Sequence, residues 1–600
     1  MNDREKTFSN VSNMVYILKQ IKEYDIKVLL FMLLESFFGV LVAFCSIIFP
    51  AFIIRMIEKK YSMEEYLINI GGLLVFYAIF YYANDYVKNR NAWQYVEFRA
   101  GFLMKKLMNT AINLPYDEYC DSKNQERFTT AQDCINSNTQ GIEKIIINFV
   151  AISTAIGSML IYLVSFGIIN PAFVLLILFA SILQFLIYGK ANYLAYEYIF
   201  PKSQQEINMN YLNRQAVDTG AAKDVRLFQM QDWLISLYEK SNYIFSQIVK
   251  KERKNFLFAD ILGLIVEIFI SMGCYGYLLY LLKQGMKIAT FVMIAGIIQV
   301  MFGYAKSIPE FIAEMNRYLS EFSECRRFLE KNVKKDKKNI FLENEKNFYI
   351  EFCHVTFCYV GSKQKILDDV SFKINPKSKI ALVGENGAGK STIIYLICGF
   401  YKPTSGDIYI NGINTKEMDR EDFKKIICTV FQDSNLLNFS IAENIACETS
   451  EKIEYEKLLD SMKKTSFYDR IEKLEQKENT YIGTTINENG INLSGGELQK
   501  LFITRALYAN RGILLLDEPT AALDAITENE IYQDYNRLCK DKTTIFISHR
   551  LASTRFCDEI WLLKGGKIIE KGTHDELIRN NGEYAKLYLT QSKYYMNEIA

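Results

Sequence analysis

Histidine is scarce in this chain, and paired cysteines are missing. Only three histidines occur among 600 residues, so the position of each one is informative. The twelve cysteines are scattered and none forms a Cys-x-x-Cys pair, which argues against a zinc site or disulfide framework and for reduced thiols. No repeat of the solenoid type is visible. The first 25 residues lack an apolar core of about 7–15 residues after a basic start, so we expect no cleavable signal there.

Long apolar runs fill the first half of the chain. Each run approaches or exceeds the ~20 residues that a helix needs to span a bilayer, and buried helices of a soluble protein would not reach this length so often. Half of all residues are apolar and the net charge is +1, as expected when a membrane domain is averaged with a polar domain. We therefore predict a lipid bilayer as a partner and no nucleic acid. The predicted spans are 27–54, 66–86, 145–168, 172–189, 257–282 and 290–312.

Two connections between the predicted spans are long and basic. Residues 87–144 and 190–256 are rich in lysine and arginine, and basic loops stay in the cytoplasm. We expect a multi-pass protein of the cytoplasmic membrane with both termini inside, and an amphipathic elbow helix within residues 1–25. The charged run 334–338 contains few apolar residues and predicts a linker at 331–345.

A phosphate-binding loop follows the predicted linker. The strand 379–383 leads into Gly384-Glu385-Asn386-Gly387-Ala388-Gly389-Lys390-Ser391, and a helix begins at Ser391-Thr392, which is the context that this motif requires. The glycines allow consecutive backbone N–H groups to face phosphate oxygens, and the helix N-terminus adds its dipole. Lys390 can reach the β- and γ-phosphates of ATP, and the Ser391 hydroxyl can bind Mg²⁺.

Two further apolar strands end in polar residues. The run 513–516 is continuously apolar, as expected of a buried parallel strand, and it ends in Asp517-Glu518. Ligands bind at the carboxyl ends of such strands. Asp517 would hold the Mg²⁺ shell, and Glu518 would polarise the attacking water as general base. The strand 543–547 leads to His549.

A second glycine motif identifies the kind of nucleotide hydrolase. Leu493-Ser494-Gly495-Gly496 lies between the phosphate-binding loop and the acidic strand, and in that position it resembles the signature of ATP-binding cassette (ABC) proteins. The resemblance implies that Ser494, Gly495 and Gly496 bind the γ-phosphate held by the opposite subunit. Glu497 departs from the family, in which glutamine is usual, but a carboxylate near a helix N-terminus is favoured by the dipole.

Four more residues take their expected roles from the same resemblance. His549 looks like the switch histidine, which contacts the γ-phosphate and orients Glu518, and Gln432 looks like the glutamine that binds Mg²⁺ and water. Asp524 looks like the aspartate loop at the dimer interface, and Tyr359 looks like the aromatic residue that stacks on adenine. Each could have a plainer role: strand packing for Tyr359, a turn position for Gln432 and core packing for His549.

The order of the elements resembles that of exporter-type ABC half-transporters. The fold class expected from this resemblance is an all-α six-helix transmembrane domain with long cytoplasmic helical extensions, followed by an α/β P-loop ATP-binding cassette. The bends of the extensions would be coupling helices near 115–119 and 219–228, although each could be a plain surface helix. The expected domains are 1–25 (elbow helix), 26–330 (transmembrane domain), 331–345 (linker) and 346–600 (cassette).

The function implied by this resemblance is ATP-driven export of a peptide, lipid or drug-like amphiphile. One chain supplies half of such a machine, so we expect a second copy related by twofold symmetry, although a heterodimer is also compatible with the sequence. Two different functions stay open as well: a membrane ATPase that does not pump, such as an ATP-gated channel or a regulator, and an importer of exporter-like fold. Ionisable residues inside spans are candidate substrate contacts unless they serve interhelix packing; they are Glu35, Asp260, Glu267 and Glu310.

Overall fold

A computed structural model of the chain describes most of its residues. The described ranges are 8–138, 140–169, 171–218, 220–331, 347–431, 434–518, 535, 538–548 and 551–597. The contacts within the chain divide it into two compact units. The first unit comprises Met1–Leu114 and Tyr119–Val333, and the second comprises Pro115–Glu118 and Lys334–Ala600.

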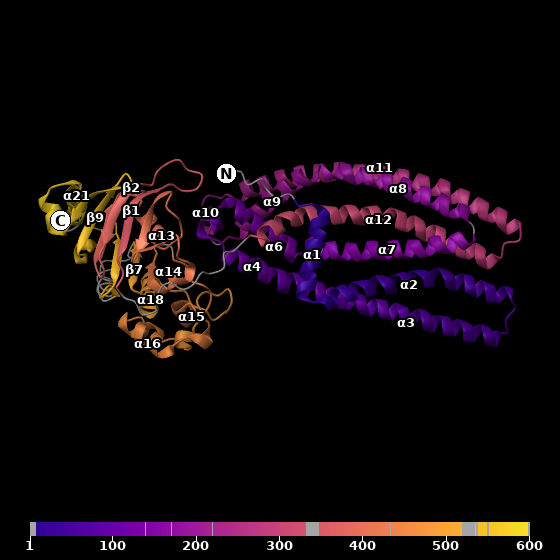
Figure 1. Cartoon of the computed structure of the whole chain (residues 1–600), viewed down its shortest axis with the longest axis horizontal. Coiled ribbons are helices and arrows are strands. Elements are labelled where there is room, and N and C mark those ends of the chain that lie inside the picture. Colours follow the sequence, from indigo (N-terminus) through magenta and orange to yellow (C-terminus); the bar gives the residue numbers. More distant parts are fainter. Residues whose placement is uncertain are drawn as a thin grey trace. The chain divides into compact units, whose positions relative to one another are not determined.

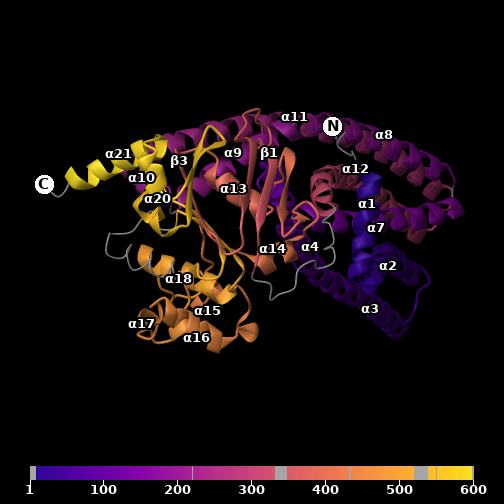
Figure 2. The same ribbon diagram turned by 60° about the vertical axis from the view of Figure 1, so that its left-hand side comes forward.

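The long helices of the first unit run side by side and the short α1 crosses them, as both Figure 1 and Figure 2 show. A π-helical turn at Glu97–Leu103 continues α3 into α4. The helices are α1 (Asn10–Tyr24), α2 (Ile26–Glu58), α3 (Met63–Val96), α4 (Met104–Ile112), α6 (Ser122–Asn136), α7 (Gly141–Ile169), α8 (Pro171–Tyr196), α9 (Ile199–Val217), α10 (Ala222–Leu227), α11 (Gln231–Lys283) and α12 (Ile288–Leu329).

Several of these helices are long and apolar enough to cross a membrane. In the described part of the chain there are five: Ile26–Glu58, Met63–Ile112, Gly141–Val164, Gln231–Lys283 and Ile288–Leu329. Each of them overlaps one of the predicted spans. The remaining predicted span, 172–189, lies on α8, a helix of 26 residues, but several side chains of α8 lie outside the described part. The first unit therefore has the helices of a multi-pass membrane protein.

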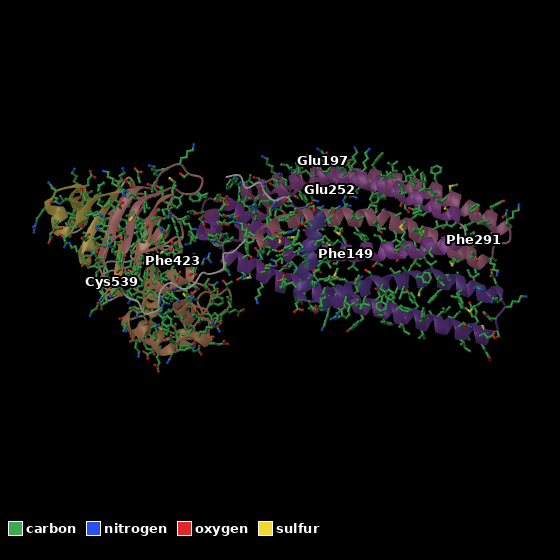
Figure 3. All side chains as sticks on the ribbon, viewed as in Figure 1. Phe149, Glu197, Glu252, Phe291, Phe423 and Cys539 are labelled. Carbon is green, nitrogen blue, oxygen red and sulfur yellow. The ribbon has the colours of Figure 1, made fainter. Side chains whose placement is uncertain are left out.

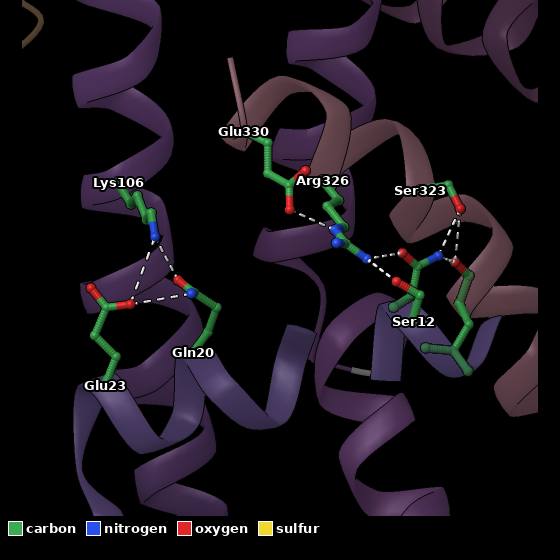
Figure 4. A network of polar contacts seen from close by, with 9 residues as sticks. Ser12, Gln20, Glu23, Lys106, Ser323, Arg326 and Glu330 are labelled. Atoms are coloured by element: carbon green, nitrogen blue, oxygen red, sulfur yellow. Dashed lines mark hydrogen bonds and ion pairs between the residues drawn. The ribbon is translucent and has the colours of Figure 1, made fainter. Parts of the chain in front are cut away.

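Polar contacts fasten α1 to the neighbouring helices (Figure 4). Arg326 on α12 donates to the Ser12 hydroxyl at 2.9 Å and to the Asn13 side-chain oxygen at 3.2 Å. Lys106 on α4 donates to Oε1 of Gln20 at 2.7 Å. The apolar side of α1 is buried in the same core as parts of α4, α6, α7 and α12. This amphipathic helix is therefore packed against the helical bundle along one face.

A buried ion pair holds the π-helical turn against α7. The Arg99 Nε lies 2.7 Å from a Glu143 carboxylate oxygen, and the two side chains are 4% and 10% exposed. One terminal nitrogen of Arg99 also donates to the backbone carbonyls of Ile135 and Asn136. Since two charges removed from water need both mutual attraction and further hydrogen bonds, this arrangement offsets their desolvation.

The second unit contains two sheets among its described residues. In the larger sheet the order is β10-β9-β3-β8-β7-β6, and all neighbouring strands are parallel except β10 and β9. The smaller, antiparallel sheet has the order β2-β1-β4-β5. The strands are β1 (Ile350–Phe357), β2 (Leu367–Ile374), β3 (Lys379–Gly384), β4 (Ser405–Ile410), β5 (Ile413–Asn414), β6 (Ile427–Val430), β7 (Ile513–Asp517), β8 (Thr543–Ile547), β9 (Glu559–Lys564) and β10 (Lys567–Gly572).

In the described part of this unit, three apolar cores join these sheets to helices, one of them packing α20 and α21 against β3 and β9. Another core combines strands of both sheets with α13, and the third packs α15, α16 and α18 against β6 and β7. Figures 1 and 2 both show α15, α16 and α18 grouped beside the strands. The predicted α/β cassette fold is confirmed. Its helices are α13 (Lys390–Ile397), α14 (Arg420–Ile426), α15 (Ile441–Ala446), α16 (Tyr455–Lys464), α17 (Tyr468–Ile471), α18 (Gly495–Ala509), α20 (His574–Arg579) and α21 (Glu583–Asn597).

A short segment from early in the chain also belongs to the second unit. Pro115–Glu118 overlaps α5 (Tyr116–Tyr119), and the Tyr116 ring stacks on the Phe400 ring with centroids 4.7 Å apart and planes 22° apart. This segment was predicted as the first coupling helix. The second predicted coupling helix contains α10 in the first unit, and its Thr219 lies outside the described residues.

Candidate nucleotide-binding site

The phosphate-binding loop connects β3 to α13 and requires glycine at its two ends. Gly384 has a φ of +148°, and a Cβ there would lie 2.3 Å from the Leu563 carbonyl oxygen. Gly389 has a φ of +105°, and a Cβ there would lie 2.8 Å from a Leu367 methyl carbon. An L-residue is therefore excluded at both positions by neighbouring atoms as well as by backbone conformation. The loop places backbone N–H groups at the start of α13, and a helix N-terminus of this kind binds anions favourably.

Lys390 is held inside this loop. Its side chain is buried, and Nζ donates to the carbonyl oxygens of Gly384 and Glu385, each at 2.9 Å. Burial lowers the pKa of the Lys390 ammonium, while the nearby carboxylates of Glu518 and Asp517 act in the opposite direction. A buried ammonium surrounded by carbonyl oxygens is suited to exchange these acceptors for phosphate oxygens.

Two carboxylates stand at the carboxyl end of β7. Asp517 is buried and pairs with Ile547 in the register of β7 with β8. Glu518 follows with a φ of +46°, which is uncommon for a residue other than glycine, and its N–H donates to the Ile547 carbonyl at 3.0 Å. The parallel strand β3 runs beside β8 into the phosphate-binding loop. The sheet therefore brings the loop and both carboxylates to the same edge.

The oxygens available at this edge fit Mg²⁺. Ser391 in the first turn of α13 offers a hydroxyl, and Asp517 offers a carboxylate. Oxygen ligands of this kind, supplemented by phosphate and water, are those that Mg²⁺ prefers. In the part of the chain that the structure describes, no compact group of three or more His, Cys, Asp or Glu side chains is found that could hold a metal.

Tyr359 lies beside the first turn of α13. Its hydroxyl is 3.0 Å from the Thr392 hydroxyl. Its ring makes edge contacts with Phe357 and Tyr401, at centroid distances of 5.0 and 5.4 Å. The ring is half-buried, so these contacts hold it in place while part of it remains accessible. The structure thus brings the predicted adenine-stacking residue to the helix that carries the phosphate-binding loop.

The signature turn caps α18 and accommodates its unusual glutamate. Ser494 Oγ accepts from the Glu497 N–H at 3.4 Å, and the Glu497 carboxylate accepts from the Ser494 N–H at 2.8 Å, which is a capping box. Arg470 on α17 donates to the other Glu497 oxygen at 2.7 Å. Burial alone would raise the pKa of Glu497, but the hydrogen bonds from Ser494 and Arg470 outweigh it and lower the pKa. Ser494 and Gly495 are exposed and Gly496 is half-buried.

Some predicted residues were not located and others were missed. Gln432, His549 and Asp524 lie outside the described residues, so their roles stay predictions. Sequence reasoning did not single out Arg470, because it lies 27 positions from Glu497 and no local pattern links the two. No sequence pattern indicated the close approach of the Leu563 carbonyl to Gly384 either, because the two residues are far apart along the chain.

Two of the candidate carboxylates in the first unit are used within the bundle. Glu35 accepts a hydrogen bond from the Asn91 side chain at 2.6 Å. Asp260 forms an ion pair with Lys306 at 3.0 Å. These contacts favour interhelix packing as the role of both residues. Lys306 was missed in the sequence, although its position four residues before Glu310 is a spacing that can indicate ionic contacts on a helix.

Comparison with known proteins gives a family model and curated relatives that each match part of the chain. Residues 367–521 match the family model described as ABC transporter. The chain is 33% identical over 359 residues to an ATP-dependent lipid A-core flippase of Pasteurella multocida, covering 59% of this chain and 61% of that protein. It is 40% identical over 238 residues to a beta-(1-->2)glucan export ATP-binding/permease protein of Bartonella quintana, covering 40% of this chain and 39% of that protein. The chain therefore spans less than two thirds of the length of these curated relatives.

A solved structure matches over nearly the whole chain. It is described as a bacterial Atm1-family ABC exporter with ATP bound, and the TM-score is 0.74. The match covers 94% of this chain and 98% of the other chain, with 23% sequence identity. At this identity the likeness concerns the fold.

Proposed function

We propose that this chain, which has the fold of an exporter-type ABC half-transporter, is an ATP-driven exporter of the cytoplasmic membrane. The observation that carries the proposal is the combination of two features in one chain. One is a set of helices long and apolar enough to span a bilayer. The other is a phosphate-binding loop at the same sheet edge as Asp517 and Glu518. A nucleotide hydrolase joined to membrane spans is organised to couple hydrolysis to transport.

The proposed hydrolysis assigns a task to each residue of the site. The backbone of 384–391 and the Lys390 ammonium would bind the phosphates, and the ring of Tyr359 would stack on the base. Glu518 would accept a proton from the attacking water. Ser391 and Asp517 would hold Mg²⁺, which neutralises phosphate charge when it is bound. The predicted roles of Gln432, His549 and Asp524 form part of this proposal.

Two copies of the chain would form the working unit. Ser494, Gly495 and Gly496 of one copy would contact ATP bound at the phosphate-binding loop of the other, so both copies would be needed at each site. ATP would then bind more tightly to the closed cassette dimer than to the open one, and this difference in affinity would shift the membrane domain between two conformations. Hydrolysis would release the closed state.

The proposed organisation keeps the boundaries predicted from the sequence. Both termini and the cassette would lie in the cytoplasm, and the segments 115–119 and 219–228 would act as coupling helices. The stack of Tyr116 on Phe400 supports this role for the first segment. The proposed domains are the elbow helix 1–25, the transmembrane domain 26–330, the linker 331–345 and the cassette 346–600.

ATP hydrolysis by the purified chain in lipid nanodiscs tests the proposal. We expect Lys390→Ala to abolish nucleotide binding. Glu518→Gln should retain binding but hydrolyse ATP about 10²–10⁴-fold more slowly, because it lacks the general base. Glu475→Gln, at an exposed position between α17 and α18, is the matched control and should behave like the wild type. Hydrolysis at the wild-type rate by Glu518→Gln would show that the assigned base is wrong.

Transport itself is tested in inside-out vesicles. ATP-dependent accumulation of a labelled amphiphile against its gradient, absent in Glu518→Gln, is the result expected of an exporter. Ion conductance without accumulation would indicate a channel, and ATP-dependent loss of preloaded ligand would indicate an importer. An intact dimer with no ATP hydrolysis would point to a different partner chain or a regulatory role.

A further inference from the structure

A pocket of about 580 Å³ opens between α8, α11 and α12 of the first unit. Its lining combines aromatic rings with charged groups. Glu252 on α11, labelled in Figure 3, is one of the charged lining residues. The lining residues that matter below are Phe185, Glu252, Phe256, Glu310, Phe311 and Arg317.

Most charges in and around this pocket are neutralised by a partner on another helix. The partners connect α12 with α7 and α11, and α11 with α9. These ion pairs are Lys306–Asp260 at 3.0 Å, Glu314–Lys144 at 3.5 Å and Glu252–Lys202 at 3.4 Å. They leave the pocket with no net charge from these six groups.

Glu310 and Arg317 differ from these six groups in their ion pairing. Within the described residues neither has an oppositely charged partner within 4.0 Å. Lys306, one turn before Glu310, forms an ion pair with Asp260. Glu314, one turn before Arg317, forms an ion pair with Lys144 and also accepts a hydrogen bond from the Asn148 side chain at 2.9 Å. Glu321, one turn after Arg317, attracts it electrostatically without forming an ion pair within 4.0 Å, so neither Glu310 nor Arg317 makes a direct ionic contact among the described residues.

Contacts with Tyr318 fix the position of the Arg317 guanidinium. One of its terminal nitrogens donates to the Tyr318 hydroxyl at 2.6 Å, and the guanidinium lies 4.5 Å from the centroid of the Tyr318 ring. Its Nε is buried and has no hydrogen-bond partner among the described residues. A buried donor of a charged group without an acceptor is unfavourable, and an anionic ligand group in the pocket would supply one.

The two groups are spaced along one face of α12. They are seven positions apart, which corresponds to about 10 Å along the helix axis and nearly two full turns. An extended peptide covers about 3.3–3.6 Å per residue, so the ends of three or four residues span this distance. The rings of Phe185, Phe256 and Phe311 supply apolar surface in the same pocket.

We propose that this pocket binds a short peptide with free ends, its amine paired with Glu310 and its carboxylate with Arg317. Apolar side chains of the peptide pack on the aromatic rings. This assignment rests on the proposed export function and gives its substrate a chemical class, a zwitterion with charges about 10 Å apart. A ligand of a single charge leaves one of the two protein groups unpaired.

Calorimetric binding by the full chain in nanodiscs, measured without ATP, tests the pocket. The probes are an unblocked tetrapeptide of leucine and phenylalanine, its N-acetylated form and its C-amidated form. We expect each block to weaken binding to the wild type about tenfold, as the loss of one charge-assisted hydrogen bond predicts. In Glu310→Gln, acetylation should have no further effect, and in Arg317→Gln, amidation should have no further effect.

Two further variants strengthen the comparison. The charge exchange Glu310→Arg with Arg317→Glu should restore the requirement for both free ends, with the peptide reversed. Glu64→Gln, at an exposed position of α3, is the matched control and should bind all three probes like the wild type.

Three results would overturn the assignment. The first is equal binding of blocked and unblocked peptides. The second is an equal effect of each block in the wild type and in the variants. The third is binding of ethanolamine lysophospholipid that depends on Glu310 and Arg317, while the peptide does not bind. Basal ATP hydrolysis is measured on the same preparations. Normal hydrolysis with no peptide binding would reject the pocket alone, whereas an intact dimer without hydrolysis would reject the proposed function of this chain as a homodimeric exporter.

Discussion

Glu497→Gln removes the charge of the signature turn while leaving its shape. The glutamine side-chain oxygen can still accept from the Ser494 N–H, as the glutamate does at 2.8 Å, so the capping box survives. The ion pair with Arg470 is lost, and that Arg470 side chain is 45% exposed. Pairs this exposed contribute at most about 1 kcal/mol because solvent screens them. We therefore expect a loss of stability below about 1 kcal/mol and ATP hydrolysis within about threefold of the wild type.

Thermal unfolding of the cassette measures this loss. For a unit of this size 1 kcal/mol corresponds to roughly 2–4 °C in the melting temperature. Glu497→Ala is the contrast, because it also breaks the capping box and should lose about 1 kcal/mol more. Arg470→Gln and the double variant complete a cycle, in which the double variant should lose less stability than the two single variants lose together.

Two outcomes would refute this reasoning. A drop in ATP hydrolysis of more than about tenfold at an unchanged melting temperature would mean that the Glu497 carboxylate acts on the phosphate chemistry, since the expected contribution of the pair is too small for such a change. Strict additivity of Arg470→Gln and Glu497→Gln would mean that the ion pair contributes nothing to stability.

Three other predictions concern the cassette and the membrane unit. Gly384→Ala would place a Cβ 2.3 Å from the Leu563 carbonyl oxygen, so we expect loss of nucleotide binding in a fluorescent-nucleotide assay. Arg99→Met leaves the buried Glu143 without its partner and should lower the free energy of unfolding by about 3–5 kcal/mol; Arg99→Met with Glu143→Leu should recover most of it in a melting experiment. The lowered pKa of Glu497 means that its stabilising effect over Glu497→Gln is full above about pH 5 and is lost as the pH falls through the folded pKa, which melting curves across pH will measure.

The phosphate-binding loop was the part of the site most open to prediction. Its residues are consecutive, and the conformation of each depends on its neighbours along the chain, so the order strand, glycine-rich loop and helix appears directly in the sequence. The apolar strand ending in Asp517 was predictable for a similar reason, because a strand covered on both faces needs an unbroken apolar run. The lengths of the apolar runs likewise gave the membrane helices.

Contacts between distant segments were decided by the tertiary structure. Arg470 meets Glu497 across 27 positions, and Arg99 meets Glu143 across 44. Neither pairing leaves a periodic or local pattern. The sequence alone determined which residues form the elements and the loop, because those depend on neighbours within a few positions. Only the packing of α7, α8, α11 and α12 determined which charges form ion pairs and which, such as Glu310, have no oppositely charged partner within 4.0 Å among the described residues, since an ion pair depends on distance in space.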